Sequence, residues 1–145
     1  MEFARGGRTV RSVGFFTELA PGWGFPAEGS LAEAVREFGE ADESRVVSYL
    51  RGGTWIWAEM GAERDVLDPE GPTLVSAGSL CTDGVWVWRE DLSYYLATYP
   101  LALPDAFVAR VRELAYSPPV VPESRLFEIA PEISGYPWTR RSRSA

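Results

Sequence analysis

The sequence predicts an α+β fold, in which a small antiparallel sheet with a tryptophan-rich face is packed by about four helices and followed by an extended, proline-rich C-terminal arm. Three observations predict this fold. An Asp83-Gly84 pair stands between two strand-like runs, a Trp-x-Trp pattern occurs twice, and apolar residues with helical spacing follow the second pattern. We therefore expect a hairpin followed directly by a helix in residues 74–99, and we expect the other elements to pack around this unit.

The hairpin is predicted from the Asp83-Gly84 pair. Asp-Gly accommodates the positive φ angles that both central residues of a type I′ turn require. A two-residue loop sets the cross-strand partners by counting, and these are Thr82–Val85, Cys81–Trp86, Leu80–Val87 and Ser79–Trp88. Because side chains alternate across a strand, Trp86 and Trp88 are expected to share one face with Cys81.

The other Trp-x-Trp pattern consists of Trp55 and Trp57, in a strand predicted over residues 54–59. If this strand is a neighbour of the strand that carries Trp86 and Trp88, four indoles lie on one face. Such a stripe is typical of a buried core, but tryptophan is also enriched in ligand pockets and at protein interfaces. The sequence leaves both interpretations open.

The first strand is expected within residues 9–19, which are rich in β-branched and aromatic residues. The turn-forming segment 21–26 follows and carries Trp23 and Phe25. These two side chains are expected either to cover the core or to form the lip of a binding site, and Trp23 is retained as a candidate binding residue.

Two helices are predicted between residues 30 and 51. The first begins at Ser30, which forms a capping box with Glu33, and its buried face is expected to carry Leu31, Val35 and Phe38. The second begins at Asp42 or Ser44 and ends before Gly52-Gly53, with an inward face formed by Val46, Val47 and Leu50.

Residues 60–73 are predicted to form a polar connection, with a short edge strand at residues 65–67. This connection and the residue before it carry five carboxylates: Glu59, Glu63, Asp65, Asp68 and Glu70. Carboxylates can act as general acids and bases or as cation ligands, although their spacing here matches no calcium loop. An ordinary solvated loop is the preferred interpretation.

Two further helices are expected after the hairpin. In residues 91–99 an apolar stripe with helical spacing is formed by Leu92, Tyr95, Leu96 and Tyr99. Tyr94 lies beside this stripe and is expected to be exposed. The last helix is expected to begin at Pro104, with a buried stripe of Phe107, Val111, Leu114 and Ala115 and with Arg110 and Arg112 in solvent.

Prolines dominate from residue 117 onward, at Pro118, Pro119, Pro122, Pro131 and Pro137. Because proline interrupts helices, we expect an extended arm here that wraps the domain. Its apolar anchors are expected to be Val120, Val121, Leu126, Phe127 and Ile129. Residues 1–139 are expected to form a single domain, and the basic residues 140–145 are expected to form a disordered tail.

The 145-residue chain has no histidine, and all 14 of its basic residues are arginine. This composition excludes Ser-His-Asp and Cys-His catalysis, histidine metal sites, Schiff-base lysines and the lysine of a nucleotide-binding P-loop. The single cysteine, Cys81, is expected to be a buried structural thiol. We therefore expect no metal, no cofactor and no catalytic residue.

The net charge of −7 makes sequence-independent binding to nucleic acid improbable, because phosphate contacts require a basic surface. An acidic protein is suited to a basic partner. No apolar run reaches the length of a membrane span, and the N-terminal residues have no apolar segment long enough for a signal peptide. A cytoplasmic location is therefore expected.

The hairpin and the following residues also carry a recognisable motif. Its residues in this chain are Thr82, Asp83, Gly84, Trp86, Trp88, Asp91, Leu92, Tyr94, Tyr95, Tyr99, Leu103, Pro104 and Phe107. The pattern resembles T-D-G-x-W-x-W, D-L-x-Y-Y, Y and L-P-x-x-F in a family of small uncharacterised actinobacterial proteins. It is also similar to the hairpin-plus-helix ending of some immunity proteins that neutralise bacterial toxins. The resemblance implies a protein partner and supplies no catalytic residue.

These observations favour a non-catalytic interaction protein, immunity- or antitoxin-like, that binds a protein partner such as a toxin, or a second copy of itself, through an acidic and aromatic surface. The alternatives are a small-molecule binding domain with an aromatic pocket and an enzyme that uses carboxylates. The candidate binding residues are Trp23, Trp55, Trp57, Asp83, Trp86, Trp88 and Tyr94.

Three structural outcomes would separate these hypotheses. A deep pocket with two carboxylates within reach of an arginine would favour the enzyme. A dry aromatic cleft would favour the small-molecule binder. A convex acidic patch with Trp23 or Tyr94 exposed would favour a protein partner.

Overall fold

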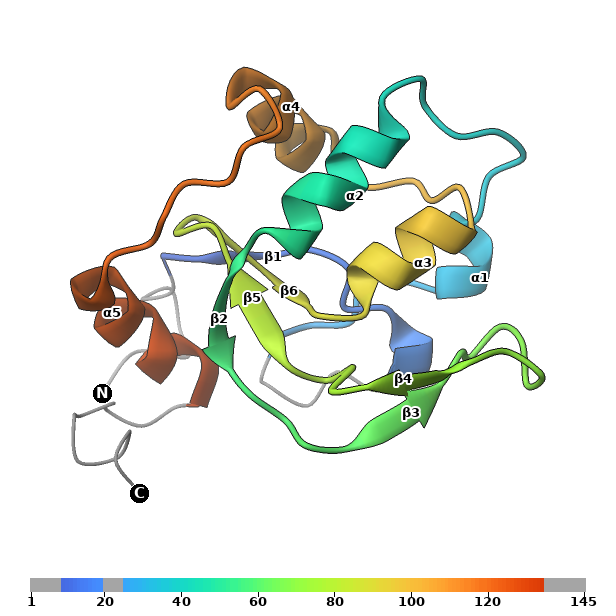
Figure 1. Cartoon of the computed structure of the whole chain (residues 1–145), viewed down its shortest axis with the longest axis horizontal. Coiled ribbons are helices and arrows are strands. Elements are labelled where there is room, and N and C mark those ends of the chain that lie inside the picture. The colour runs from blue at the N-terminus through green and yellow to red at the C-terminus, as the bar shows by residue number, and fades with distance from the viewer. Residues whose placement is uncertain (1–8, 20–24, 135–145) are drawn as a thin grey trace.

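The structure is a computed structural model that describes residues 9–19 and 25–134 (Figure 1). Its elements are, in chain order, β1 (Arg11–Ser12), the 3-10 helix η1 (Thr17–Leu19), α1 (Leu31–Ala34), α2 (Glu43–Arg51), β2 (Thr54–Trp57), β3 (Ala62–Arg64), β4 (Thr73–Val75), β5 (Leu80–Thr82), β6 (Trp86–Arg89), α3 (Leu92–Thr98), α4 (Asp105–Glu113) and α5 (Glu123–Ser134). Helices packed on a small sheet confirm the predicted α+β class. Trp23 and residues 140–145 lie outside the described residues.

The main sheet has the strand order β1-β6-β5-β2. The pairs β5–β6 and β2–β5 are antiparallel, as predicted, but β1 runs parallel to β6, with Arg11 opposite Trp86. The sheet is therefore mixed rather than wholly antiparallel. The strand expected within residues 9–19 is only two residues long, because the chain leaves the sheet at Val13 and turns through η1.

A separate two-stranded ribbon is formed by β3 and β4, beyond the ends of β2 and β5 (Figure 1). Ala62 pairs with Val75, and Arg64 pairs with Thr73. The edge strand was expected at residues 65–67, and this position is wrong by three residues. Asp65 instead begins the loop between the two strands.

The hairpin between β5 and β6 is present, but its register differs from the predicted one by two residues. Cys81 lies opposite Trp88, and Thr82 lies opposite Val87. The turn is displaced by one residue, to Gly84 and Val85, because the Asp83 N–H donates to the Trp86 carbonyl at 3.2 Å. The Asp83 carboxylate stabilises this turn by accepting hydrogen bonds from the backbone N–H groups of Val85 and Trp86, at 2.9 and 2.7 Å. A slip of two residues is even, so Trp86, Trp88 and Cys81 still share one face, as predicted.

The four indoles would share one face only if the two Trp-x-Trp strands were neighbours, and they are not, because β5 lies between β2 and β6. Trp55 is opposite Cys81, so it belongs to the same face as Trp86 and Trp88, but it lies at the edge of the sheet and is 49% exposed. A bulge between Trp55 and Trp57 places Trp57 opposite Leu80, which belongs to the other face. Only Trp86 and Trp88 lie in the core beneath the helices.

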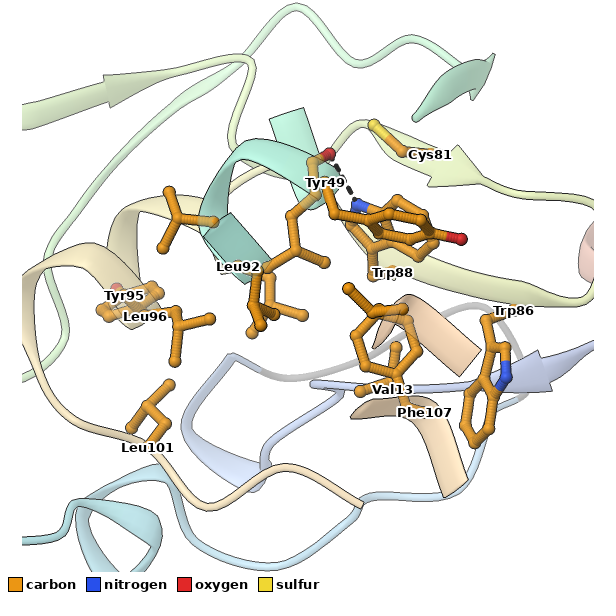
Figure 2. Packing of buried hydrophobic residues seen from close by; sticks show 14 of the residues in the cluster. Val13, Tyr49, Cys81, Trp86, Trp88, Leu92, Tyr95, Leu96, Leu101 and Phe107 are labelled. Atoms are coloured by element: carbon orange, nitrogen blue, oxygen red, sulfur yellow. Dashed lines mark hydrogen bonds between the residues drawn. The ribbon is translucent and has the colours of Figure 1, made fainter. Parts of the chain in front are cut away.

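Helices α2, α3 and α4 cover the face of the sheet that carries Trp86 and Trp88 (Figures 1 and 2). Phe107 of α4 meets both indole rings edge-on, with centroid distances of 5.3 and 5.8 Å. The Trp88 indole nitrogen donates to the carbonyl of Leu50 in α2, at 3.2 Å. Trp86 and Trp88 are therefore structural, and of the two interpretations of the tryptophan stripe, the buried core is the correct one for this pair.

Helix α5 covers part of the opposite face, where Ile129 packs with Ile56, Leu80 and Val87 of the sheet. This helix replaces the predicted extended arm, so in the described stretch from residue 117 to residue 134 only residues 117–122 lack regular structure. The Pro122 carbonyl accepts from the N–H groups of residues 125 and 126 and so opens the helix. Val121 is buried as expected, whereas Val120, expected to be an anchor, is 91% exposed.

The helices before the sheet follow the prediction in part. The Ser30 hydroxyl accepts from the Glu33 N–H at 3.3 Å, as the capping box requires. However, α1 ends at Ala34, because the next residues leave the helix and Val35 pairs with Leu101. Phe38, expected to be buried, is 76% exposed. In α2 the predicted inward face is confirmed, since Val46, Val47 and Leu50 are buried.

Helix α3 has the predicted buried stripe of Leu92, Tyr95 and Leu96. Helix α4 buries Phe107 and Val111, but its predicted stripe stops there. Leu114 is half-buried, and Ala115 is exposed in a turn with a positive φ of 52°.

Replacing Gly53 by alanine is expected to destabilise the protein by about 1–3 kcal/mol, because a Cβ atom there would overlap the six-membered ring of Trp88. Urea unfolding followed by tryptophan fluorescence measures this loss. Gly61→Ala is the matched control, since no atom lies within 4 Å of its added Cβ, and we expect a change within about 0.5 kcal/mol. Equal losses in the two variants would contradict the close packing.

Glu18 fixes the start of α1, and we expect this contact to make stability depend on pH. Desolvation opposes the charged form, but hydrogen bonds from the N–H groups of Ala32 and Leu31 and from the Ser30 hydroxyl lower the pKa of Glu18 from 4.5 to about 2. A lowered folded-state pKa stabilises the protein above pH 4.5, and this stabilisation disappears as the pH falls toward 2. Unfolding free energies measured from pH 5 to 2 should therefore fall less steeply for Glu18→Gln than for the wild type, and parallel curves would contradict this role.

Candidate functional site

The predicted site residues do not converge on one place. Trp86 and Trp88 are core residues, Trp55 lies at the edge of the sheet, and Trp57 packs toward α5. Asp83 is buried in the hairpin turn, and Tyr94 lies on α3 near the β3–β4 loop. Those predicted binding residues that the structure describes therefore do not form a single binding surface.

Asp83 is a structural centre. Besides the two turn N–H groups, its carboxylate accepts from the Tyr49 hydroxyl at 2.6 Å and from the Arg110 guanidinium at 2.9 Å. Burial and this hydrogen bond raise the pKa of Tyr49, so its hydroxyl remains a donor. Arg110, expected in solvent, instead ties α4 to the hairpin.

Tyr94 is also engaged within the chain. Its hydroxyl and that of Tyr99 both donate to the Asp65 carboxylate at 2.7 Å, and the Tyr95 hydroxyl accepts from the Val66 N–H at 3.0 Å. Burial opposes charge on Asp65, but the two tyrosine hydroxyls lower its pKa below the usual value. These contacts hold the β3–β4 loop against α3, and Tyr94, expected to be exposed, is half-buried.

One carboxylate of the acidic connection pairs with a buried arginine. Glu63 approaches Arg89 at 3.3 Å, and Arg89 is itself buried in an ion pair with Asp91 at 2.9 Å. Within residues 9–19 and 25–134 no group of three or more potential ligands is arranged to hold a metal ion. Burial raises the pKa of the Cys81 thiol to about 12, so it is no nucleophile near neutral pH.

A pocket of about 280 Å³ lies between the α1–α2 connection, α2, the end of α3 and α4, and we call it the α2–α4 pocket. Its apolar lining residues, called the floor below, are Val46, Leu96, Leu101, Leu103, Val108 and Ala109. Its charged lining residues, called the rim below, are Arg36, Glu40, Asp42, Glu43, Asp105 and Arg112. Four carboxylates thus face two guanidinium groups, which leaves the rim net negative.

Backbone pairing between the α1–α2 connection and the segment after α3 positions the first of these charged side chains, Arg36. Val35 and Leu101 form an isolated bridge, and the Arg36 N–H donates to the Pro100 carbonyl at 2.6 Å. The Arg36 side chain then reaches the Leu101 carbonyl at 3.0 Å and Glu43 at 3.4 Å. Its Nε atom is buried without a hydrogen-bond partner among the described residues.

Arg112 is held on the other side of the pocket. It forms a two-bond ion pair with Asp42, at 2.8 and 3.0 Å, and the Tyr116 hydroxyl donates to the same carboxylate at 2.6 Å. These hydrogen bonds from Arg112 and Tyr116 hold the pKa of Asp42 well below its usual value. Arg112 is exposed, as expected, and also cross-links α4 to the start of α2.

The remaining carboxylates are less constrained. Glu40 lies 3.5 Å from both Arg36 and Arg112, a long distance for an ion pair. Desolvation raises the pKa of Glu43, although the charge of Arg36 opposes the rise. Asp105, exposed in the first turn of α4, makes no hydrogen bond or ion pair with the described part of the chain.

No protein-family model, curated protein or solved structure matches this chain. The resemblance to actinobacterial and immunity proteins therefore stays a prediction. Among the helices of the described segments, none has the length and apolar character needed to cross a membrane.

The pocket was missed in the sequence because its lining comes from segments about sixty residues apart, which no local pattern joins. Of the acidic run from Glu40 to Glu43, only Asp42 was interpreted, as a possible start of a helix. The exposed Phe38 beside this run was assigned to a buried face. An aromatic residue between acidic neighbours in a glycine-containing connection was the available signal.

Proposed function

We propose that this chain is a cytoplasmic, non-catalytic interaction protein of the immunity or antitoxin kind. It binds a basic protein partner, such as a toxin, through the α2–α4 pocket and the adjoining residues 37–41. The observation that carries this proposal is an acidic pocket rim next to Phe38, which is 76% exposed.

Phe38 supplies the apolar anchor that such a surface needs. A large exposed aromatic side chain buries much area on binding, and such residues are frequent among interface hot spots. Glu37 and Glu40 lie beside it in the sequence, so a basic partner would meet charge and apolar area together. The net charge of −7 favours fast association with such a partner at low salt.

Two alternatives have less support. The small-molecule hypothesis required an aromatic pocket, and the α2–α4 pocket has no aromatic residue in its lining. The homodimer hypothesis involves some tryptophans buried between subunits, and Trp86 and Trp88 are covered by α2, α3 and α4 of their own chain, which leaves Trp55, 49% exposed, for such an interface.

An enzyme remains the second candidate. A pocket with two carboxylates within reach of an arginine favours an enzyme, and the α2–α4 pocket has this arrangement. Glu43 is the residue that fits a general acid, since it is half-buried and its pKa is raised by desolvation. Against this candidate, both arginines are already paired within the chain. Chromogenic ester and glycoside substrates test it: turnover by the wild type that Glu43→Gln lacks would favour the enzyme.

The interaction function is tested with the tagged full-length chain as bait in its native host. We expect a basic partner that is released by salt, retained by the Glu113→Gln control and lost from a Phe38→Ala/Asp105→Asn double variant. All three substituted residues are solvent-facing, so the variants should keep the wild-type unfolding midpoint. Recovery of the bait alone as a monomer, or retention of the partner by the double variant, would overturn the proposal.

A further inference from the structure

We propose that the α2–α4 pocket is a receptor for one guanidinium group, the side chain of an arginine on the partner. This inference rests on the proposed function for the source of the arginine, but the pocket chemistry can be tested without the partner.

The size of the pocket limits the ligand. Pockets for drug-sized molecules and cofactors are usually about 300–1,000 Å³. At about 280 Å³ the α2–α4 pocket falls just below that range, so it suits one long side chain rather than a nucleotide or a folded peptide turn.

The floor of the pocket suits an aliphatic stem. Leu96 and Leu101 are buried, and Leu103 and Val108 are half-buried around them. The three methylene groups of an arginine side chain pack along such apolar surface, and its guanidinium group can reach the charged residues that line the same pocket. A compact cation without a stem would leave this surface uncovered.

The rim selects a cation. Arg112 is bound to Asp42 by two hydrogen bonds, and Arg36 is bound to the Leu101 carbonyl and approaches Glu43, so each guanidinium already faces a carboxylate, although the Arg36 Nε atom is buried without a hydrogen-bond partner among the described residues. Asp105 is unpaired among the described residues, and Glu40 makes only long contacts. An entering cation would therefore find carboxylates on α4 and on the α1–α2 connection.

A planar guanidinium fits this arrangement better than an ammonium. Its donors point in fixed directions and can serve carboxylates on two sides, and it is more weakly hydrated than an ammonium group. The rim already shows this preference, because Glu40 lies between the guanidinium groups of Arg36 and Arg112.

The test is an NMR titration of the isotope-labelled full chain with N-acetyl-arginine methylamide. The citrulline analogue has nearly the same shape without the charge, and the lysine analogue has the charge without the plane. We expect amide shifts confined to residues 36–46 and 96–112 with the arginine compound, weaker shifts with lysine and none with citrulline. Asp105→Asn should raise the dissociation constant about fivefold, and Glu113→Gln on the same helix should leave it unchanged.

Several outcomes would overturn this assignment. These are the absence of saturable shifts at millimolar ligand, equal shifts with citrulline, tighter binding of lysine, or an unchanged constant in Asp105→Asn. The two proposals can fail separately. A partner lost on Phe38→Ala alone with no arginine binding would leave the interaction function standing, whereas arginine binding without any partner would leave only the pocket assignment.

Discussion

Replacing Phe107 by alanine is expected to destabilise the protein by about 3–5 kcal/mol, because this ring is the centre of the aromatic core. It is fully buried and contacts the rings of Trp86, Trp88 and Tyr49 at centroid distances of 5.3, 5.8 and 6.1 Å. Removing it leaves a cavity that indole rings, fixed on a strand, cannot close. Urea unfolding followed by tryptophan fluorescence measures the loss.

The matched control for this substitution is Phe38→Ala, which removes the same atoms from a side chain that is 76% exposed. We expect a change within about 0.5 kcal/mol there. A loss below about 1 kcal/mol in Phe107→Ala, or equal losses in the two variants, would contradict the packing described for α4.

Asp83→Ala is expected to destabilise the protein by about 2–4 kcal/mol. The substitution removes the acceptor of two turn N–H groups and of the Tyr49 hydroxyl, and it leaves the Arg110 guanidinium without its anion. The range is set below that of a fully buried ion pair, because the Arg110 side chain is 27% exposed. Thermal and urea unfolding measure the effect.

Two further variants separate the causes of this loss. Asp68→Ala removes an exposed carboxylate that accepts only the Glu70 N–H, and we expect it to cost less than about 1 kcal/mol. Adding Arg110→Met to Asp83→Ala should recover part of the loss, since no uncompensated cation then remains. If the double variant is no more stable than Asp83→Ala, the ion pair is not the reason for the burial of Asp83.

Side-chain periodicity predicted the parts of this fold in which one element packs on one face. The spacing of Leu92, Tyr95 and Leu96 predicted the buried side of α3, and it is confirmed. The hairpin faces were also predicted, although the register was not. Register depends on the turn, and the turn lies one residue later than the Asp-Gly rule places it, because the Asp83 side chain binds the backbone N–H groups of Val85 and Trp86.

Helix α5 was not predicted, because the prolines in this part of the sequence indicated an extended arm. A buried stripe at helical spacing was present in Leu126, Ile129, Ala130 and Ile133, and Pro122 is well placed to open a helix. The prediction gave more weight to the number of prolines than to their positions. Pro131 lies inside the helix and removes one backbone donor, which the helix tolerates while its apolar face is buried.

The candidate site was the least predictable part. Trp57 changed faces through a bulge, and the rim of the pocket joins Arg36 to residues 101–105 by chain pairing. Both depend on contacts between distant segments, and the sequence pattern of either segment alone carries no information about the other.

The contact between the first and last described segments determines when this protein can finish folding during synthesis. The Glu132 carboxylate accepts from the N–H groups of Thr9 and Val10, across a separation of more than 120 residues, and β1 also waits for β6. While the chain is still on the ribosome, β1 therefore has no strand to pair with until β6 has emerged. The N–H groups of Thr9 and Val10 have no Glu132 carboxylate to bind until α5 has emerged. The nascent protein is thus exposed to misassociation until both of these later segments have emerged.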